Sequence, residues 1–459
     1  MLTDNSVNRY LEENQQRFIV ELKRWVAIPS LSADPSHVAD VRRCAERIVD
    51  HMSEIGLESE LLETDGNPIA YGEWAQAKAA PTLLIYGHYD VQPADPLDLW
   101  QTPPFEATVR NGKIFGRGVV DDKGQVLMHL AALEAWLHAQ NRLPLNVKVV
   151  IEGEEEIGSP NFETFLERNH ERLKCDVAVI SDTAMFAEGV PSLTTSLRGV
   201  VHWEIRVDGP ATDVHSGTFG GIVRNPIEAL AKIIATLKDA DDRVTVPGFY
   251  DGIEALSEQE RRALQHLPFD EADQALQLGI PKLAGERGCL PLERLWYRPT
   301  LECNGIWGGY QGPGSKTIIP AYACAKLSAR LVAGQDPATI KRRVEEFLHK
   351  AVPDGVVVHV SSYSDVRAVH TSHDHPAVKA AARAVEAEFG KPPVLIGTGG
   401  TIGPVSSFDR ILHLPQVLIG VGLPDDAIHA PNEKFNLRQF FAGMKTMARF
   451  YGELAAALQ

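Results

Sequence analysis

The sequence predicts an α/β fold, in which a first domain with a mostly parallel sheet flanked by helices carries an inserted α+β domain with an open sheet covered by two helices. Short apolar runs such as 82–86 and 147–151 are typical of strands buried on both faces, as in parallel sheets between helices. In the middle of the chain, at 201–207 and 323–332, apolar and polar residues alternate, which indicates strands with one solvated face. The two patterns together favour two kinds of sheet in one chain.

The segments of the first domain follow one another along the chain. Helical spacing at 10–26 and 41–55, with a break at Pro29, indicates two outer helices. Apolar residues at helical spacing from Val126 to Leu137 indicate a third helix with an apolar inner face. Another amphipathic helix is expected from Pro376. Four apolar strands complete the domain, at 82–86, 147–151, 176–180 and 416–420.

The inserted domain has its own strand and helix patterns. Helical patterns at 226–238 and 337–350 follow its two alternating strands, and a further strand is predicted at 356–360. A long segment with short helical patterns, 241–298, interrupts this order. We therefore predict a discontinuous first domain over 1–198 and 376–459, and an inserted domain over 199–375.

Composition narrows the classes of partner. The 459 residues, 44% hydrophobic, suffice for two or three domains with their own cores. The net charge of −16 argues against sequence-independent binding to nucleic acid or anionic lipid. Neither a basic leader with an apolar core nor an apolar run of membrane-spanning length is found, so we expect a cytoplasmic protein without nucleic-acid or membrane partners. The five cysteines are widely spaced, and indicate neither a disulfide framework nor a thiolate zinc site.

Side chains that can bind a metal ion follow each of the four apolar strands. His88 and Asp90 follow the first strand, the glutamates at 154–156 the second, Asp182 the third and His429 the fourth. The carboxyl ends of parallel strands meet at one edge of a sheet, where open α/β sheets bind their ligands, so we expect these side chains to converge. Several carboxylates in one crevice would repel one another unless cations neutralise them.

Single members of this set have simpler alternatives. A run of glutamates is usually a solvated patch, but the run at 154–156 ends an apolar strand and is closed by Gly158. Asp121 and Asp122 lie just before a helix, where a capping role and a ligand role fit the local pattern equally well. The convergence of several segments therefore supports the prediction more strongly than any one motif.

The chemistry of the set indicates a metal-dependent hydrolase. His88, Asp121, a glutamate of the 154–156 run, Asp182 and His429 offer nitrogen and oxygen but no sulfur. Such donors suit zinc, manganese or cobalt, and can hold two ions when one carboxylate bridges them. Two ions would activate a water molecule near neutral pH and polarise a substrate carbonyl. One glutamate is then left over to act as general base.

Several motifs resemble those of a known family over nearly the whole chain. They are GHYDVQP at 87–93, GRGVVDDKG at 116–124, EGEEEIGS at 152–159, SD at 181–182, DVHSGTFGG at 213–221 and AIHAPNE at 427–433. The chain resembles the dinuclear-metal exopeptidases and deacylases that include aminoacylase, succinyl-diaminopimelate desuccinylase, glutamate carboxypeptidase and carnosinase. Within this family it is most similar to the carnosinase-like dipeptidases, which carry GHYDVQP and a similarly enlarged inserted domain.

The resemblance implies a role for each residue of the predicted site. The first domain would be the metal-binding catalytic domain and would hold two divalent ions, with Zn²⁺ as the expected metal and Mn²⁺ or Co²⁺ as alternatives. The peptide bond between Asp121 and Asp122 would be cis. By position, one ion would be bound by His88 and Asp182 and the other by Glu156 and His429, with Asp121 as the bridge, Glu155 as general base and Asp90 orienting His88.

The resemblance also implies roles in the inserted domain, as a lid or dimerisation domain. His215 would reach the active site of a partner subunit in a homodimer and stabilise the oxyanion. Arg330 would bind the terminal carboxylate of the substrate, for which its planar fork is well shaped. Thr317, Gly400 and Thr401 fall at positions of substrate-backbone contacts. In relatives the turn that corresponds to 399–401 has the sequence GGS and is preceded by glutamate, whereas Thr398 and Thr401 stand at the places of the glutamate and the serine here.

The expected function is hydrolysis of small dipeptides by a metal-bridged water with a glutamate general base. With aspartate at position 182 the chain resembles the aminopeptidase and dipeptidase members of the family, whereas glutamate at this position is typical of its carboxypeptidases and deacylases. The alternative is an N-acyl amino acid deacylase or a carboxypeptidase with the same site, and a free or blocked α-amino group on the substrate distinguishes them. A phosphate-binding loop at 312–317 is disfavoured, because Ser315 separates Gly314 from Lys316.

Overall fold

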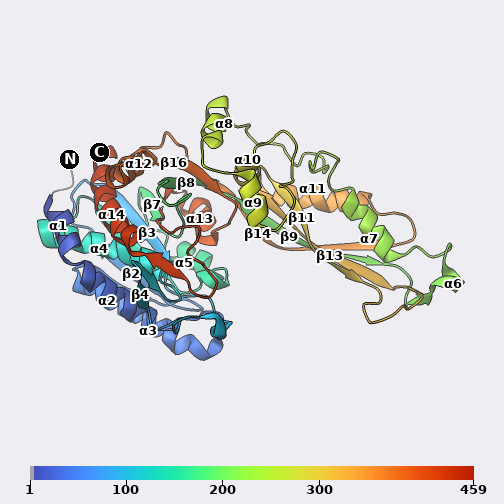
Figure 1. Ribbon diagram of the computed structural model, residues 1–459, viewed down its shortest axis with the longest axis horizontal. Helices are drawn as coiled ribbons and strands as arrows, with labels where there is room; N and C mark the ends of the chain where they lie inside the picture. Colours follow the sequence, from blue (N-terminus) through green and yellow to red (C-terminus); the bar gives the residue numbers. More distant parts are fainter. Residues whose placement is uncertain (1–4, 459) are drawn as a thin grey trace. The chain divides into compact units, whose positions relative to one another are not determined.

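The chain forms two compact units in the computed structural model, which describes residues 5–458. The first unit runs to Thr195 and returns at Thr371–Ile396 and from Gly403, and the second comprises Ser196–His370 and Gly397–Ile402. Positions 1–4 and 459 of the predicted first domain lie outside the described residues. The mixed α/β class is confirmed, with a parallel centre to the main sheet (Figure 1). The functional roles of the two predicted domains stay predictions.

A nine-stranded sheet is built mainly from the first unit. Its central strands, in the order β6-β3-β7-β17, run parallel, and the flanking strands β2 and β8 run antiparallel to β6 and β17 respectively. Helices cover the parallel centre, which explains its near-continuous apolar sequence. The strands are β1 (Glu58–Leu62), β2 (Ile69–Trp74), β3 (Thr82–His88), β6 (Asn146–Glu152), β7 (Val177–Ile180), β8 (Ser192–Leu197), β15 (Val369–His370), β16 (Val394–Thr398) and β17 (Gln416–Leu418).

The register of the parallel strands brings their carboxyl ends to one edge. His88 at the end of β3 pairs with Glu152 at the end of β6, and Tyr86 pairs with Ile180 at the end of β7. The residues that follow these strands therefore leave the sheet side by side, as expected for parallel neighbours. Two of the predicted metal ligands, His88 and Asp182, lie at this edge.

Helices pack on both faces of this sheet. The larger core lies under α1 (Asn5–Glu13), α2 (Gln15–Val26), α3 (Val38–Glu54), α4 (Lys123–Gln140), α12 (Pro376–Phe389) and α14 (Leu437–Ala457). Helix α4 is buried nearly all round over its first ten residues, as expected for a helix of largely apolar sequence. On the other face, the rings of Phe162 in α5 (Phe162–Asn169) and Phe408 pack edge-on against Tyr86. Phe408 follows α13 (Gly403–Ser407) and begins the π-helix Phe408–Leu412.

A small three-stranded sheet joins two distant segments of the first unit. It has the order β18 (Lys434–Asn436), β5 (Lys113–Phe115) and β4 (Thr108–Arg110), and all its pairs are antiparallel. Lys434 pairs with Phe115, so the segment after His429 lies beside the segment before Asp121.

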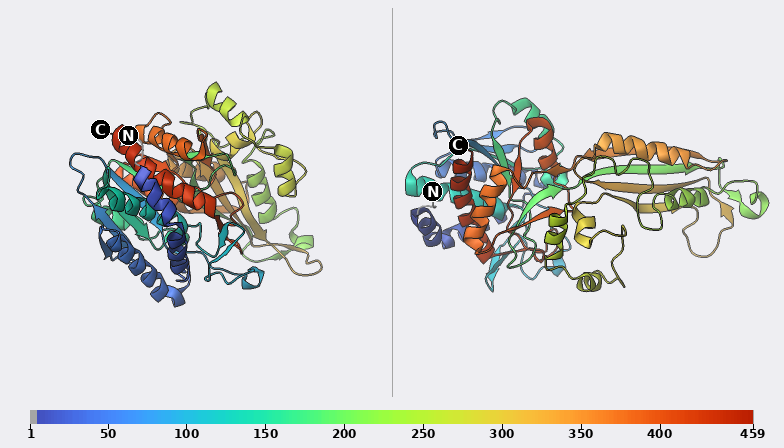
Figure 2. Two further views of the ribbon diagram at one scale, coloured as in Figure 1. Left: turned by 60° about the vertical axis from the view of Figure 1, so that its left-hand side comes forward. Right: turned by 90° about the horizontal axis from the view of Figure 1, so that it is seen from above.

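The second unit is built on a four-stranded antiparallel sheet. Helices α7 (Pro226–Ala235) and α11 (Pro337–Lys350) pack on it around the core residues Trp203, Ile205 and Leu327 (Figure 2). The sheet has the order β11 (Thr300–Gly308), β13 (Tyr322–Leu331), β9 (Gly199–Asp208) and β14 (Val357–Val366). The remaining elements are β10 (Val214–His215), β12 (Ile318–Ile319), α6 (Ser216–Phe219), α8 (Glu258–Gln265), α9 (Glu271–Gln277) and α10 (Pro291–Trp296).

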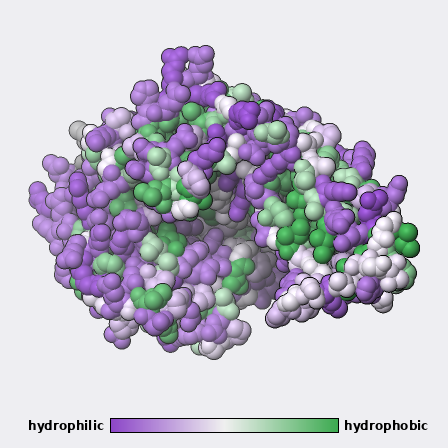
Figure 3. Space-filling model, turned by 45° about the vertical axis from the view of Figure 1, so that its right-hand side comes forward, coloured by the Kyte–Doolittle hydropathy of each residue, from purple (hydrophilic) through white to green (hydrophobic). Residues whose placement is uncertain are grey.

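Hydrophilic residues cover most of the face drawn in Figure 3, with hydrophobic residues in scattered groups. Such a surface is expected for a folded chain in which 23% of the residues are charged. Within residues 5–458, none of the helices has both the length and the apolar character needed to cross a membrane.

Candidate metal centre

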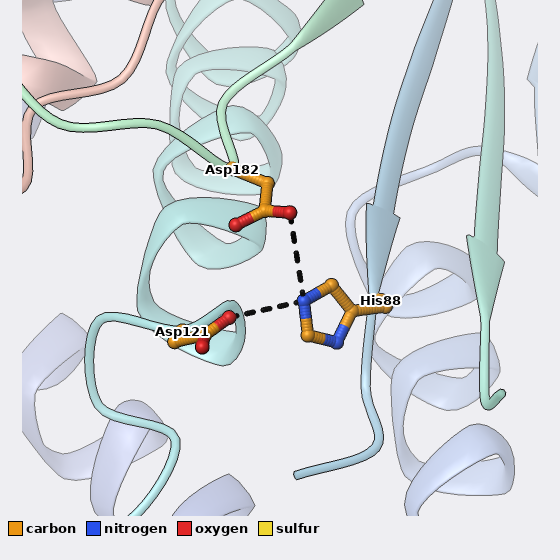
Figure 4. A group of neighbouring side chains, drawn as sticks. All are labelled: His88, Asp121 and Asp182. Atoms are coloured by element: carbon orange, nitrogen blue, oxygen red, sulfur yellow. Dashed lines mark hydrogen bonds and ion pairs between the residues drawn. The ribbon is translucent and has the colours of Figure 1, made fainter. Parts of the chain in front are cut away.

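The first group of candidate ligands consists of His88, Asp121 and Asp182, whose ligand atoms lie within 4.8 Å of one another. His88 ends β3, Asp121 lies in the loop before α4, and Asp182 follows β7 (Figure 4). The Nε2 atom of His88 is 3.1 Å from Asp121 Oδ1 and 4.0 Å from Asp182 Oδ2. We call these three residues the inner triad.

The second group consists of Asp121, Glu156 and His429, and we call it the outer triad. The Nε2 atom of His429 lies 2.9 Å from Asp121 Oδ2 and 3.2 Å from Glu156 Oε2. Asp121 thus belongs to both triads, with Oδ1 facing one imidazole and Oδ2 the other. The structure brings together all five residues that the sequence predicted as ligands.

The two triads differ in exposure. The side chain of His88 is fully buried and that of Asp182 is 19% exposed, whereas the side chain of His429 is 53% exposed. Burial and the neighbouring Asp121 raise the pKa of Asp182 to about 7. Asp121 itself is buried, yet its hydrogen bonds with His429 and His88 hold its pKa below the usual range. Hydrogen bonds to Asp121 and Glu156 raise the pKa of His429 to about 10.

Glu155 lies beside the triads on the one-turn 3₁₀ helix Glu155–Ile157. Burial, together with the nearby carboxylates of Asp182 and Glu156, raises its pKa to about 9. A carboxyl group with a raised pKa, close to candidate metal ligands but outside both triads, has the properties expected of a general base.

Asp90 is a buried carboxylate that contacts both His88 and the Glu155 segment. Its Oδ1 atom lies 3.4 Å from His88 Nδ1. The backbone N–H groups of Glu155 and Glu156 donate to its two oxygens, at 3.3 and 3.1 Å. The sequence predicted the contact with His88, whereas the hydrogen bonds to the glutamate segment were not predicted. One side chain therefore connects a candidate ligand to the segment of the candidate base.

The capping alternative for the acid pair is not supported. Asp122 occupies the N-cap position of α4, but its side chain makes no capping hydrogen bond. Its Oδ2 atom instead accepts a hydrogen bond from the backbone N–H of His88, at 3.2 Å. The cis peptide that the resemblance implied between Asp121 and Asp122 is present.

The second unit holds the residues predicted to contact substrate, in two groups. In the first, Arg330 Nη1 donates to Thr401 Oγ1 at 2.8 Å, and Thr401 Oγ1 donates to the Arg198 carbonyl at 2.6 Å. The Arg198 guanidinium donates to the Gly399 carbonyl at 3.2 Å, and the Gly400 N–H donates to Thr398 Oγ1. Arg330, Gly400 and Thr401 therefore lie together.

The second group contains His215 and Thr317. Strand β10 pairs His215 with Ile318 of β12, and the Ser216 N–H donates to the Thr317 carbonyl at 3.0 Å. His215 is exposed, and its Nδ1 atom accepts a hydrogen bond from the Gly217 N–H at 3.0 Å. With Nδ1 as acceptor, the neutral ring carries its proton on Nε2.

Comparison with known proteins identifies the family. The model of peptidase family M20/M25/M40 matches residues 84–453, which include all five candidate ligands and Glu155. The chain belongs to this family. The sequence-based resemblance to metal-dependent exopeptidases is therefore confirmed.

Relatives of this M20 peptidase match it over nearly its full length. A Cys-Gly metallodipeptidase of Schizosaccharomyces pombe is 32% identical and covers 97% of both chains. The human Beta-Ala-His dipeptidase is 32% identical over 98% of this chain and 92% of its own. Among solved structures, an M20 family metallo-carboxypeptidase from Sulfolobus solfataricus superposes with a TM-score of 0.83, at 33% identity over 96% of this chain and 99% of its own.

The donor set of this M20 peptidase fits divalent cations. Its carboxylates are packed closely enough that burial and mutual repulsion raise the pKa values of Asp182 and Glu155. A divalent ion in each triad would offset that repulsion and favour the ionised carboxylates and neutral imidazoles that metals require. The absence of sulfur donors in either triad suits zinc, manganese or cobalt.

Two residues near the M20 triads were missed by sequence reasoning. Gln92 Nε2 donates to Glu156 Oε2 at 2.9 Å. The carboxylate of Glu433 accepts hydrogen bonds from Arg117 and from the loop that carries Asp121. Both residues stand inside quoted motifs, GHYDVQP and AIHAPNE, and only this membership could have indicated them. Their contacts depend on segments far apart in the chain.

Proposed function

We propose that the protein is a metal-dependent dipeptidase that hydrolyses the peptide bond of small dipeptides with a free amino group. The observation that carries this proposal is the pair of carboxylate–imidazole triads that share Asp121. Its full-length relatives include a Cys-Gly metallodipeptidase and a Beta-Ala-His dipeptidase, which supports a dipeptide as the substrate.

Each triad would hold one ion. His88 and Asp182 would bind the first, Glu156 and His429 the second, and Asp121 would bridge them, with Zn²⁺ as the expected metal and Mn²⁺ or Co²⁺ as alternatives. When bound, the ions would supply Lewis-acid polarisation of the scissile carbonyl and a lowered pKa for the attacking water.

Glu155 is the proposed general base. Its carboxylate would accept a proton from the attacking water and deliver it to the nitrogen of the leaving amine. Cations in both triads would lower its pKa from the value of about 9 that burial and neighbouring carboxylates produce. Asp90 would hold both His88 and the backbone of Glu155 in place, through the contacts it makes with each.

Residues of the second unit would bind the substrate. Arg330 would bind its terminal carboxylate, and Thr317, Gly400 and Thr401 its backbone. His215 would donate from Nε2 to the developing oxyanion in the active site of the partner subunit of a homodimer. The hydrogen bond from the Gly217 N–H to His215 Nδ1 supports this role, because it leaves Nε2 as the donor of the neutral ring.

A second candidate is a carboxypeptidase or N-acyl amino acid deacylase with the same metal centre. It is favoured by the similarity to the Sulfolobus solfataricus metallo-carboxypeptidase, which is as high as that to the dipeptidases. The substrate distinguishes the two candidates, since a dipeptidase acts on a free α-amino group and a deacylase on a blocked one.

The test is hydrolysis of matched panels of unblocked dipeptides, N-acyl amino acids and longer peptides. Chelator-stripped protein is assayed before and after addition of Zn²⁺, Mn²⁺ or Co²⁺. Cleavage of unblocked dipeptides only after metal is restored supports the proposal. Cleavage confined to N-acyl substrates or to carboxyl-terminal residues of longer peptides would assign the second function, and absence of metal-dependent hydrolysis would reject both.

A further inference from the structure

Glu433 is a buried carboxylate that the proposed reaction does not use. It follows His429 by four residues and is 0% exposed. Each of its oxygens accepts two hydrogen bonds. Oε2 accepts from Arg117 Nη1 at 2.8 Å and from the Gly118 N–H at 2.9 Å, and Oε1 accepts from the N–H groups of Val120 and Asp121 at 3.1 and 3.3 Å.

Three of these donors are backbone groups of the loop between β5 and α4. Buried backbone N–H groups need a partner, and here a side chain supplies it in place of a neighbouring strand. The amide of Asp121 is one of the three. The carboxylate of Glu433 therefore contacts the backbone from which the side chain shared by both triads projects.

The main chain of Glu433 is itself anchored. The Gly116 N–H donates to the Glu433 carbonyl at 3.0 Å, and the next residue, Lys434, pairs with Phe115 in the small sheet. The same segment carries His429, whose Nε2 atom lies 2.9 Å from Asp121 Oδ2. Glu433 thus joins the loop of Asp121 to the loop of His429.

We infer that Glu433 is a positioning residue for the metal centre, which holds Asp121 where its two oxygens face the two imidazoles. The inference rests on the proposed function only in that the triads bind metal ions. Removing a residue that hydrogen-bonds to a metal ligand without binding the metal itself costs on the order of 10–100-fold in metal affinity or activity. Glu433→Gln has this effect because its amide nitrogen places a donor against N–H donors.

The experiment is a titration of the chelator-stripped full-length protein with Co²⁺. Calorimetry measures the affinity, and visible absorption reports the geometry of the ligands around the ion. The matched control is Glu21→Gln, because Glu21 is also buried and held by an arginine, Arg47, and by Trp25. We expect Glu433→Gln to bind Co²⁺ on the order of 10–100-fold more weakly, with an altered spectrum. Glu21→Gln should lower the unfolding temperature but keep the affinity and spectrum.

A milder variant covers the case in which Glu433→Gln does not fold. Glu433→Asp keeps the charge but is one methylene shorter, so it should weaken Co²⁺ binding less than the amide variant. Wild-type Co²⁺ affinity and spectrum in either folded Glu433 variant would overturn the inference. An equal loss in Glu21→Gln would do so too, because general destabilisation would then explain both. Metal binding is read without a peptide substrate, so a failure of the dipeptidase proposal would appear separately, as intact Co²⁺ binding without hydrolysis.

Discussion

At the scale of single residues, Asp121 connects the two triads. Its Oδ1 atom lies 3.1 Å from the imidazole of His88, and its Oδ2 atom lies 2.9 Å from that of His429. A carboxylate placed in this way can bridge two ions, and Glu155 belongs to neither triad. The proposed division of roles, with Asp121 as the bridge and Glu155 as the base, rests on which carboxylate oxygens face an imidazole.

Replacing Glu155 tests that division directly. We expect Glu155→Gln to lower kcat on the order of 100–10,000-fold, because an amide cannot accept the proton of the attacking water. Metal content, measured by elemental analysis, should stay at the wild-type level. The exposed Glu167→Gln serves as control and should hydrolyse dipeptides like the wild type. A fully active Glu155→Gln protein would remove the base assignment.

Residue identities at the centre could be predicted from sequence to different degrees. His88 ends one apolar strand, and Asp182 and His429 come after two others, so their convergence could be predicted from the strand pattern. Asp121 could not be told from a helix cap by its local pattern, and only its distances to two imidazoles separate the alternatives. Glu433 was not predicted, because its donors lie more than three hundred residues away in sequence.

At the scale of elements, the central strands of the main sheet could be predicted from the sequence, whereas the short strands of the small sheet could not. The apolar strands β3, β6 and β7 were predicted because burial on both faces removes polar residues from their sequence. The short strands of the small sheet, such as β5 and β18, have no such signal, since their pairing depends on residues far apart in the chain. For the same reason, sequence did not predict that Gly397–Ile402 groups with the second unit.

Helix α4 contains a buried histidine that should couple stability to pH. His129 lies between Tyr451 Oη at 2.9 Å and Ser181 Oγ at 2.8 Å, and burial lowers its pKa to about 3. The unfolded chain, with a histidine pKa of about 6.5, binds a proton between these values that the folded chain does not. The free energy of unfolding should therefore fall as pH falls from 6.5 towards 3, by up to about 1.4 kcal/mol per pH unit from this group.

Denaturant unfolding of metal-free protein at several pH values measures this slope. His129→Gln should show a flatter dependence below pH 6.5 than the wild type, because glutamine does not titrate. His266 is exposed, and His266→Gln should keep the wild-type slope. Equal slopes in the wild type and His129→Gln would mean that His129 does not set the acid sensitivity.

At the scale of the whole molecule, the proposed homodimer makes each active site depend on two chains. Glu155 belongs to the first unit, and His215 lies in the second, exposed and with its Nε2 atom as donor. If His215 acts on the partner's substrate, a variant that lacks it still offers an intact metal centre. Subunits with different defects can then complement each other.

Mixing two inactive variants tests this arrangement. His215→Ala and Glu155→Gln should each be nearly inactive, whereas unfolding and refolding them together should restore part of the wild-type activity. The restored site combines Glu155 of one chain with His215 of the other. Sedimentation should show a dimer throughout. A mixture no more active than its components, or a fully active monomer, would contradict action in trans.

Metal removal should affect the stability of the folded protein as well as its activity. Ions that bind the folded chain and not the unfolded chain stabilise it by about 2.7 kcal/mol at a hundredfold excess over Kd. We therefore expect chelation to lower the unfolding temperature and Zn²⁺ to restore it, as measured by calorimetry. An unfolding temperature that does not respond to Zn²⁺ would show that the triads bind it weakly or not at all.

The unequal exposure of the two imidazoles has a kinetic consequence. His88 lies at the closed end of the centre, with 0% exposure, while the side chain of His429 is 53% exposed. A chelator that approaches from bulk solvent meets the outer triad first, so an ion held there should leave and re-enter faster than one held by His88. The outer position would then follow whatever divalent cation the surrounding solution offers, and the inner one would keep the ion it first acquired. One protein chain could thus carry two different metals, an inner ion acquired early and an outer ion taken from the present solution.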